Sequence, residues 1–430
     1  PIIDGSNLLK TSGFYIKNRK ERCRRCNHPI VPIPFNQCTC DKECSYCTNC
    51  LQLGKVKSCS MFFHIPEPNE FKKVPEPILH WKGKLSAQQE AAAQELIQSI
   101  DHCETRLLWA VAGAGKTEML FPGIERAIRQ NKRICLASPR VDVCLELAPR
   151  IQQAFPDVPI SVLYGDMEEP YTYAQLTVAT THQLYRFKEA FDLLIIDEID
   201  AFPYRMDKAL QYAAEKSRKS VSTLIFLTAT PDQTYQKRIE KKQLKASILP
   251  ARYHGFALPV PKIVREKNWQ KALLHHFPNT KLFKQMQQLF KSQKKFLLFA
   301  PNIDWMTAFS EVIKTHFETA RFEAVHSQDP ERKAKVLSMR NEELDFLVCT
   351  TILERGVTFP NIDVLVIGSD DRIFTESALV QIAGRAGRSP QYPTGNVLFY
   401  HDGLTKEIKK AIRQITKMNE IAKKRGLLNS

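Results

Sequence analysis

The stretch LLWAVAGAGKTEML, from Leu107 to Leu120, decides how the chain folds. An apolar run is followed by small residues, then by Gly115, Lys116 and Thr117 at the start of a helix-like segment. Small residues in such a loop let backbone N–H groups point inward and hold phosphates, aided by the helix dipole. The stretch therefore predicts a phosphate-binding loop, although Ala110 stands where the full pattern has glycine.

This loop provides most of the predicted nucleotide-binding residues. Lys116 is expected to reach the β- and γ-phosphates, and the Thr117 hydroxyl is expected to bind magnesium. The residues predicted to bind the nucleotide here are Gly113, Ala114, Gly115, Lys116, Thr117 and Glu118.

A second segment, FDLLIIDEID from Phe191 to Asp200, indicates hydrolysis. Its strand-like run ends in two acids, which a parallel sheet exposes at its carboxyl edge, where ligands bind. Asp197 is expected to hold magnesium, and Glu198 to polarise the attacking water. An acidic pair after a strand is also a common helix N-cap, so the phosphate loop upstream is what favours catalysis.

A third segment, QIAGRAGR from Gln381 to Arg388, places two arginines three residues apart. On a helix, Arg385 and Arg388 would share one face and reach the same anion. An arginine at a γ-phosphate stabilises the charge of the transition state. Because these arginines belong to a second α/β block, hydrolysis is expected to require the two blocks to close.

The domain organisation follows from length and composition. A chain of 430 residues is expected to form two or three domains, at roughly 100–200 residues each. Apolar strand-like runs alternate with amphipathic segments in two successive blocks, which is typical of parallel sheets covered by helices. The predicted bounds are 1–70 for a cysteine-rich module, 71–84 for a proline-rich connector, 85–249 for the first α/β domain and 250–430 for the second, with a C-terminal helix.

The charge of the chain indicates a polyanionic partner. Its net charge is +16, which favours nucleic acid or an anionic membrane face, although surplus lysines can also serve solubility alone. An apolar run long enough to span a bilayer and a signal-peptide pattern are both missing from the sequence given. The expected location is therefore the cytoplasm.

Together these segments resemble the motifs of superfamily 2 helicases, which have two RecA-like domains. The motifs follow in order: LSAQQ, the phosphate loop, SPR at 138–140, TTHQLYR from Thr180, DEID, TAT at 228–230, FAPN, TTILERGVTFP and QIAGRAGR. The resemblance implies that Gln89 reads the adenine of ATP and that Gln381 and Gly356 contribute to the ATP site. Gly356 could instead face the nucleic-acid strand.

The same resemblance implies a set of residues that grip a nucleic-acid strand. Several of them are arginines or hydroxyls just past strand ends, where they hydrogen-bond phosphates without reading sequence. The predicted contacts are Pro139, Arg140, Thr180, Thr181, Arg186, Asn302, Thr350 and Thr351.

Eight cysteines cluster between Cys23 and Cys59. The first CxxC pair is Cys23 and Cys26, and the second is either Cys44 with Cys47 or Cys47 with Cys50, separated from the first by 17 or 20 residues. Both spacings fit a tetrahedral Cys₄ zinc site. The pattern predicts one zinc ion, and the full set of eight leaves a second open: Cys23, Cys26, Cys38, Cys40, Cys44, Cys47, Cys50 and Cys59.

With this module added, the chain resembles the ComFA family of competence proteins. The resemblance rests on the CSYCTNCLQLGKV, HWKGKLS, DEIDAFPY and TTILERGVTFP segments. It implies an ATPase stimulated by DNA, using ATP, Mg²⁺ and Zn²⁺, that draws single-stranded DNA through the uptake channel from the cytoplasmic side. It also implies ComEC and ComFC as partners, and leaves open an oligomer and contact with the inner membrane face.

Three alternatives compete with this interpretation. A replication-restart helicase of the PriA type also joins such a motor to cysteine-bound zinc, but its cysteines usually lie within the second half of the motor. A DEAD-box RNA helicase has Asp-Glu-Ala-Asp where this chain has DEID. A binding scaffold without activity would have a degenerate ATP site, whereas the catalytic positions are all filled.

Overall fold

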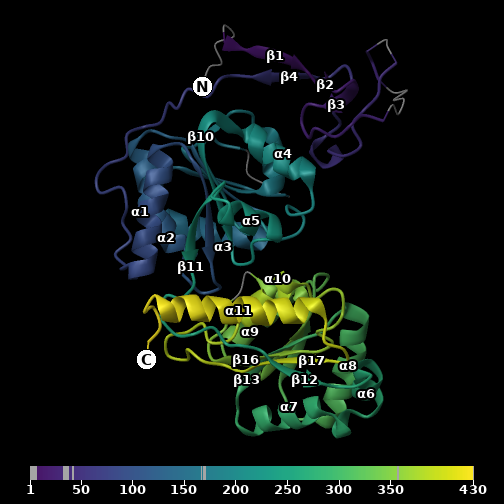
Figure 1. Cartoon of the computed structure of the whole chain (residues 1–430). Helices are drawn as coiled ribbons and strands as arrows, with labels where there is room; N and C mark the ends of the chain where they lie inside the picture. Colours follow the sequence, from purple (N-terminus) through teal and green to yellow (C-terminus); the bar gives the residue numbers. More distant parts are fainter. Residues whose placement is uncertain are drawn as a thin grey trace. The chain divides into compact units, whose positions relative to one another are not determined.

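The computed structural model describes residues 7–31, 38–40, 43–165, 167, 171–355 and 358–429. The chain forms two compact units (Figure 1). The first unit comprises Pro1–Leu85, Glu90–Leu108 and Thr117–Ser247, and the second comprises Ser86–Gln89, Trp109–Lys116 and Ile248–Ser430. The domain limits proposed from the sequence remain predictions.

The N-terminal module is built from short antiparallel strands and very little apolar core. Its elements are β1 (Leu9–Ser12), β2 (Phe14–Lys17), β3 (Lys20–Cys23), the 3₁₀ turn η2 (Leu51–Leu53) and β4 (Met61–His64), with β1 paired to β4 and β2 to β3. Among its described residues, the buried apolar side chains are Phe14, Val56 and five cysteines. So small a core cannot hold a fold by hydrophobic burial alone, and the cysteines supply most of the interior.

A seven-stranded sheet forms the centre of the first α/β region. Its strand order is β11-β5-β10-β9-β6-β8-β7. The strands are β5 (Thr105–Ala110), β6 (Ile134–Ser138), β7 (Ile160–Leu163), β8 (Leu176–Thr180), β9 (Phe191–Ile196), β10 (Arg218–Thr228) and β11 (Lys245–Leu249). The pairs β7 with β8, β8 with β6, β6 with β9, and β9 with β10 are parallel.

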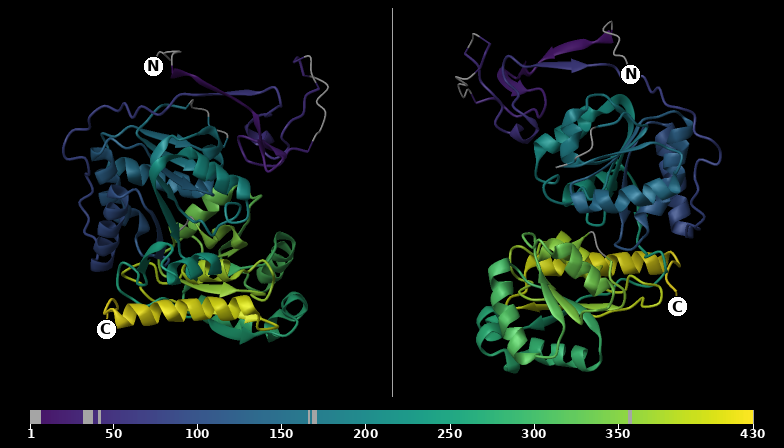
Figure 2. Two further views of the ribbon diagram at one scale, coloured as in Figure 1. Left: turned by 45° about the horizontal axis from the view of Figure 1, so that its top comes forward. Right: turned by 180° about the vertical axis from the view of Figure 1, so that it is seen from behind.

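Helices cover both faces of this sheet (Figures 1 and 2). The helical elements are α1 (Ala87–Asp101), α2 (Lys116–Arg129), α3 (Val141–Ala154), η3 (Thr181–Arg186), α4 (Lys208–Ser217) and α5 (Gln233–Glu240). Every residue of β6 and of β8 is buried, which requires cover on both sides. Continuous apolar strands of this kind are characteristic of parallel sheets, so the predicted α/β class is confirmed.

The second unit contains a six-stranded sheet in the order β12-β17-β16-β13-β15-β14, with parallel pairing throughout. Its strands are β12 (Lys262–Arg265), β13 (Lys295–Phe299), β14 (Phe322–Val325), β15 (Phe346–Cys349), β16 (Ile362–Val366) and β17 (Val397–His401). Its helical elements are α6 (Trp269–His275), η4 (Phe277–Asn279), α7 (Lys281–Lys291), α8 (Ile303–His316), α9 (Arg332–Arg340), η5 (Thr351–Glu354), α10 (Glu376–Ala383) and α11 (Lys406–Lys424). Phe277, Phe309 and Phe346 are fully or almost fully buried in its core.

Side-chain caps define where many of these helices begin. A hydroxyl, amide or carboxylate oxygen accepts a hydrogen bond from a backbone N–H in the first turn at Asp207, Asp232, Thr280, Asn302, Thr375 and Thr405. Each such cap contributes about 0.5–2 kcal/mol to helix stability. None of the described helices combines the length and the apolar character needed to cross a bilayer.

Candidate nucleotide, zinc and nucleic-acid sites

The phosphate loop has the backbone that its sequence predicts. Strand β5 ends at Ala110 and helix α2 begins at Lys116, so the loop leads directly into a helix N-terminus. Gly113 and Gly115 have φ values of 84° and 72°, in the left-handed region that favours glycine. The structure therefore places the predicted glycines where only a residue without a Cβ fits at little cost.

Gln89 holds the backbone of this loop. Its side-chain amide donates to the carbonyl of Ala114 at 2.9 Å and to that of Gly115 at 3.1 Å. Its own carbonyl oxygen accepts from the backbone N–H of Ser86 at 2.8 Å. The geometry thus gives Gln89 a positioning contact with the loop, and the predicted reading of adenine stays a prediction.

The two predicted catalytic acids follow β9 directly. Glu198 is buried and has a φ of 56°, which is uncommon for a residue with a side chain. Its backbone N–H donates to Oδ1 of Asp197 at 2.8 Å. A left-handed residue of this kind costs about 1–3 kcal/mol, and such strain concentrates at functional sites.

Asp200, which the sequence analysis left without a role, ties this acidic turn to the end of β10. Its carboxylate is buried and accepts hydrogen bonds from the hydroxyls of Thr228 at 2.7 Å and Thr230 at 2.6 Å. The two threonines belong to the TAT segment. The DEID and TAT segments are therefore joined by two short hydrogen bonds to one buried carboxyl group.

The structure corrects the expectation that Arg385 and Arg388 share a helix face. Helix α10 ends at Ala383, so Arg385 lies in the turn that follows the helix and Arg388 lies just beyond that turn. Gly387 has a φ of 66°, which no helix continues. Arg385 is fully buried and donates to the backbone carbonyl of Glu354 at 3.0 Å, whereas Arg388 is partly exposed and donates to that of Gly384 at 2.8 Å.

Two further residues of the second unit, Gln381 and Gly356, are predicted to belong to the ATP site. Gln381 is buried within α10. Gly356 lies outside the described residues. Its neighbour Arg355 is buried and donates to the hydroxyl of Ser377 at 3.1 Å.

Arg252 is a buried cation that sequence reasoning missed. Its guanidinium donates to the backbone carbonyls of Gly387 and Gly384. A Cβ at Gly113 would lie 3.5 Å from its Cγ, so the side chain also lies beside the phosphate loop. Burial, together with the nearby Arg388 guanidinium, lowers the pKa of Arg252, although an arginine stays protonated at neutral pH.

Several predicted strand contacts of the first unit line one hollow of about 1230 Å³. Pro139, Thr180 and Arg186 contribute from the ends of β6 and β8 and from η3. His182 lines the same hollow and was not predicted from the sequence. Residues 48–51 of the cysteine module also line it. The hollow therefore combines the carboxyl edge of the sheet with the module.

Other predicted strand contacts have different surroundings. Thr181 is fully buried, and the side chain of Asn302 caps α8 by accepting from the N–H of Trp305 at 2.8 Å. Arg140 is the partly buried N-cap residue of α3. Thr350 and Thr351 follow the end of β15 as predicted and are partly exposed.

A second hollow of about 600 Å³ is rich in basic and aromatic side chains. It shares Leu53, Tyr185 and Arg186 with the first hollow. Its other cations are Arg24, Arg25, Lys188 and Lys216, and its other aromatic rings are Phe62, Phe63 and Phe187. Cations interleaved with aromatic rings are the composition that binds single-stranded nucleic acid.

Lys216 is a half-buried cation of this second hollow. Its ammonium donates to the backbone carbonyl of Tyr185 at 2.9 Å. Burial, and to a lesser extent the Arg25 guanidinium, lowers the pKa of Lys216 to about 8. A phosphate brought into the hollow would favour the protonated form of this amine.

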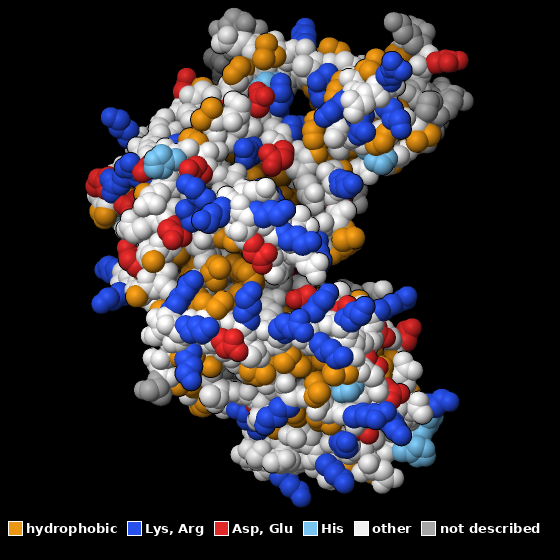
Figure 3. Space-filling model, viewed as in Figure 1, with side chains coloured by type: hydrophobic (Ala, Val, Ile, Leu, Met, Phe, Trp, Pro, Cys, Tyr) orange, Lys and Arg blue, Asp and Glu red, His pale blue; other side chains and the backbone are white. Residues whose placement is uncertain are grey.

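Basic residues also gather on the second unit, where Figure 3 shows Lys and Arg side chains along α11. The helix carries seven of them: Lys406, Lys409, Lys410, Arg413, Lys417, Lys423 and Lys424. Its apolar face, which includes Ile408, Ile415 and Met418, is buried. The positive charge of the chain is therefore concentrated in part on one helix face.

The eight clustered cysteines separate into two groups of four. Cys23, Cys26, Cys47 and Cys50 form the first group, and Cys38, Cys40, Cys44 and Cys59 form the second. Within each group the sulfur atoms lie within 4.8 Å of one another. The geometry thus selects Cys47 with Cys50 as the second CxxC pair of the first group and assigns Cys44 to the other.

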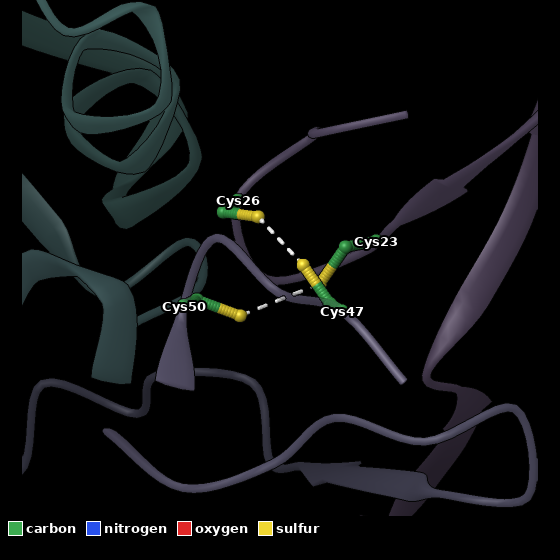
Figure 4. Close-up of side chains that lie close together, drawn as sticks. All are labelled: Cys23, Cys26, Cys47 and Cys50. Carbon is green, nitrogen blue, oxygen red and sulfur yellow. Dashed lines mark hydrogen bonds between the residues drawn. The ribbon is translucent and has the colours of Figure 1, made fainter. Parts of the chain in front are cut away.

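The first group is enclosed. Its four side chains are at most 4% exposed, and their sulfurs converge from the end of β3 and from the segment before η2 (Figure 4). The Sγ atoms of Cys26 and Cys47 are 3.5 Å apart, and those of Cys23 and Cys50 are 3.7 Å apart. Tetrahedral zinc with Zn–S bonds of about 2.3 Å separates sulfurs by about 3.8 Å, so this group could hold one zinc ion.

Comparison with known proteins gives the family. The "Competence protein ComFA" of Bacillus subtilis is 42% identical over 425 residues, covering 98% of this chain and 90% of the relative. The protein of the same name from Streptococcus pneumoniae is 40% identical, covering 94% of this chain and 92% of the relative. The chain belongs to the ComFA family.

Three domain families match successive parts of this ComFA chain. The ComFA N-terminal domain matches residues 2–64 and so includes both cysteine groups. The type III restriction enzyme res subunit matches residues 82–233, which contain the phosphate loop and the DEID segment. The helicase conserved C-terminal domain matches residues 281–390, which contain the TTILERGVTFP and QIAGRAGR segments. The ComFA chain is therefore built as a superfamily 2 helicase.

Solved structures confirm the predicted fold of the two α/β regions. S. cerevisiae Dbp5 bound to RNA and ADP BeF3 aligns with a TM-score of 0.55 and 13% identity, covering 80% of this chain and 98% of that one. RecG bound to a three-way DNA junction aligns with a TM-score of 0.53 and 17% identity, covering 81% of this chain and 49% of that one. Both likenesses support the two RecA-like domains predicted for this ComFA.

The link through Asp200 is open to a direct test. Replacing Thr230 with Val removes one hydrogen bond to a buried carboxylate, so the free energy of unfolding should fall by about 1.5–3 kcal/mol. Urea denaturation measures the change. Thr234→Val on the exposed first turn of α5 is the control, and an equal effect of the two substitutions would contradict the link.

Proposed function

We propose that this member of the ComFA family is an ATPase stimulated by single-stranded DNA that moves along the strand during DNA uptake in natural transformation. The observation that carries the proposal is the arrangement of the first unit. The strand β9 ends in the acidic turn, whose Asp200 binds the end of β10, while η3 lines both hollows. Residues suited to hydrolysis and to strand binding thus occupy one sheet.

The proposed hydrolysis uses the phosphate loop and the acidic turn. Lys116 would bind the β- and γ-phosphates, and Thr117 and Asp197 would hold a Mg²⁺ ion whose charge would offset that of the phosphates. Glu198 orients a water molecule and accepts its proton as the water oxygen bonds to the γ-phosphorus and the bond to the β-phosphate oxygen breaks. The products are ADP and inorganic phosphate.

Arg385 and Arg388 are proposed to stabilise the charge that develops on the γ-phosphate, and Gln381, Gly356 and Gln89 to complete the ATP site. Because Arg388 is partly exposed, its side chain can extend toward an anion without disturbing buried side chains. Arg385 is buried and donates to the carbonyl of Glu354. To bind the γ-phosphate it would have to exchange this hydrogen bond for one to a phosphate oxygen.

The strand is proposed to follow the two hollows of the first unit. Arg186 faces both, and the cations of the second hollow bind phosphates without reading sequence. The rings of Phe62 and Phe63 offer stacking surfaces for bases, each contact of this kind being worth about 1–3 kcal/mol. Single-stranded DNA is favoured over RNA because the relatives of the family are competence proteins.

Zinc and partners complete the proposal. The first cysteine group is proposed to bind one Zn²⁺ that holds the module together, since its small apolar core needs such support. The basic face of α11 is proposed to meet an anionic surface, either the inner membrane face or a partner of the uptake channel such as ComEC or ComFC. The proposed location is cytoplasmic.

The nucleic-acid preference decides between the proposal and its alternatives. ATPase rates should be compared with single-stranded DNA, duplex DNA and RNA at one stated salt concentration, because such binding depends strongly on salt. We expect single-stranded DNA to raise the rate most. Stimulation by RNA alone would support an RNA helicase instead, and preference for branched duplex DNA would support a restart helicase.

Loss of Lys116 should remove hydrolysis without unfolding the chain. Lys116→Ala deletes the cation expected at the β- and γ-phosphates, so the rate should fall by about 100-fold or more. Circular dichroism checks the fold, and Lys241→Ala at the exposed end of α5 is the matched control. Normal turnover in the Lys116 variant would remove the motor from consideration.

Arg186 tests the proposed path of the strand. Arg186→Ala should weaken binding of single-stranded DNA and lower the slope of log affinity against log salt concentration by about 0.7. Fluorescence anisotropy over a salt series measures both quantities. The control is Arg238→Ala on the exposed side of α5, outside both hollows, and matching behaviour of the two variants would place the strand elsewhere.

A further inference from the structure

We propose that Cys38, Cys40, Cys44 and Cys59 form a second zinc site. This site would join the two ends of the loop between Cys44 and Cys59, which contains two of the four ligands of the first site. The second group is separate from the first, because the two share no ligand. The inference goes beyond the proposed ATPase, since it concerns the metal content and assembly of the module.

The sulfur geometry of the second group fits one tetrahedral ion. The Sγ of Cys59 lies 3.5 Å from the Sγ of Cys38 and 3.5 Å from that of Cys44. All four sulfurs lie within 4.8 Å of one another. A single zinc ion with bonds of about 2.3 Å would bring them to separations of about 3.8 Å, so that no sulfur–sulfur distance would have to change by more than about 1 Å.

Other uses of four cysteines fit less well. A disulfide joins two sulfurs at about 2.05 Å and would leave the other two without a role. An iron–sulfur cluster would separate the sulfurs further, because several iron atoms and bridging sulfides lie between the ligands. Convergence of four thiols on one point is the arrangement of a Cys₄ zinc site.

Neighbouring side chains support thiolate ligands at this point. The Ser58 hydroxyl donates to Sγ of Cys44 at 3.3 Å, and the Lys57 ammonium donates to Sγ of Cys38 at 3.5 Å. Four thiolates around Zn²⁺ carry a net charge of about −2, which a nearby cation partly offsets. Donors of this kind orient ligands and tune metal affinity.

The ligands of the two sites alternate along the chain. Cys47 and Cys50 of the first site lie between Cys44 and Cys59 of the second. The base of this loop is already paired, because Cys47 N–H donates to the carbonyl of Val56 at 2.9 Å and Ser58 N–H to that of Ser45 at 2.9 Å. A metal bound by Cys44 and Cys59 would fasten the two ends of the loop.

Fastening the loop affects more than the metal. Its tip contributes residues 48–51 to the hollow that also includes Arg186. Closing a loop lowers the entropy lost when its tip adopts one conformation. The second zinc therefore fastens the ends of the loop and is called the outer metal. The first zinc binds Cys47 and Cys50 within the loop and is called the inner metal.

The two sites differ in access to solvent. Every ligand of the first site is buried, whereas Cys59 is exposed and Cys38 and Cys40 are partly exposed. A chelator should consequently remove zinc from the second site first. Two rates of zinc release would therefore indicate two separate zinc sites.

The test is metal analysis of the full-length protein. Elemental mass spectrometry should find two zinc ions per chain, and Cys38→Ser/Cys59→Ser should retain one. Release to the chelator 4-(2-pyridylazo)resorcinol should show two phases of equal size, and the faster phase should disappear in that variant. Cys103→Ser, outside both groups, is the control and should keep two zinc ions.

Two results would overturn the inference. One is a single zinc per chain that the Cys38→Ser/Cys59→Ser variant retains. The other is a native disulfide within the second group, found by mass spectrometry after alkylation. If the double variant loses both zinc ions, the zinc content of a Cys59→His variant tests the second site, because histidine can also bind zinc. Two zinc ions in Cys59→His support the second site, and one contradicts it.

Discussion

Parallel pairing of β6, β8, β9 and β10 is the constraint on which the functional parts of the first unit depend. Parallel strands end at one edge of their sheet, so the loops that follow them gather there. The SPR, TTHQLYR, DEID and TAT segments are far apart in sequence, yet each follows one of these strands. A single choice of strand direction thus brings the residues proposed for hydrolysis to the same edge of the sheet as those proposed to bind a nucleic-acid strand.

Asp200 makes this alignment rigid at one point. Its two hydrogen bonds of 2.7 and 2.6 Å restrict how far the acidic turn and the end of β10 can move relative to each other. Any movement of the acidic turn must therefore move the end of β10 as well. In the proposed ATPase, this link would connect changes at the acidic turn to the end of β10.

Local patterns in the sequence predicted the strands, the phosphate loop and the acidic turn, because apolar runs and glycine positions report on their own backbone. The helical placement of Arg385 and Arg388 was wrong because Gly384 and Gly387 end α10 earlier. Asp200, Arg252 and Lys216 went unnoticed, since only tertiary packing reveals their burial. The spacing of Cys44, Cys47 and Cys50 fitted two pairings, and only distances between sulfurs separated them.

The alternating order of the two cysteine groups has a consequence for how the module meets changes in its surroundings. The outer group is the more accessible, because Cys59 is exposed and Cys38 and Cys40 are partly exposed, whereas every cysteine of the inner group is buried. Scarcity of zinc would strip such a module in a fixed order, outer metal before inner. The N-terminal module would then lose the metal that fastens the ends of its loop while the inner metal still joined Cys23, Cys26, Cys47 and Cys50.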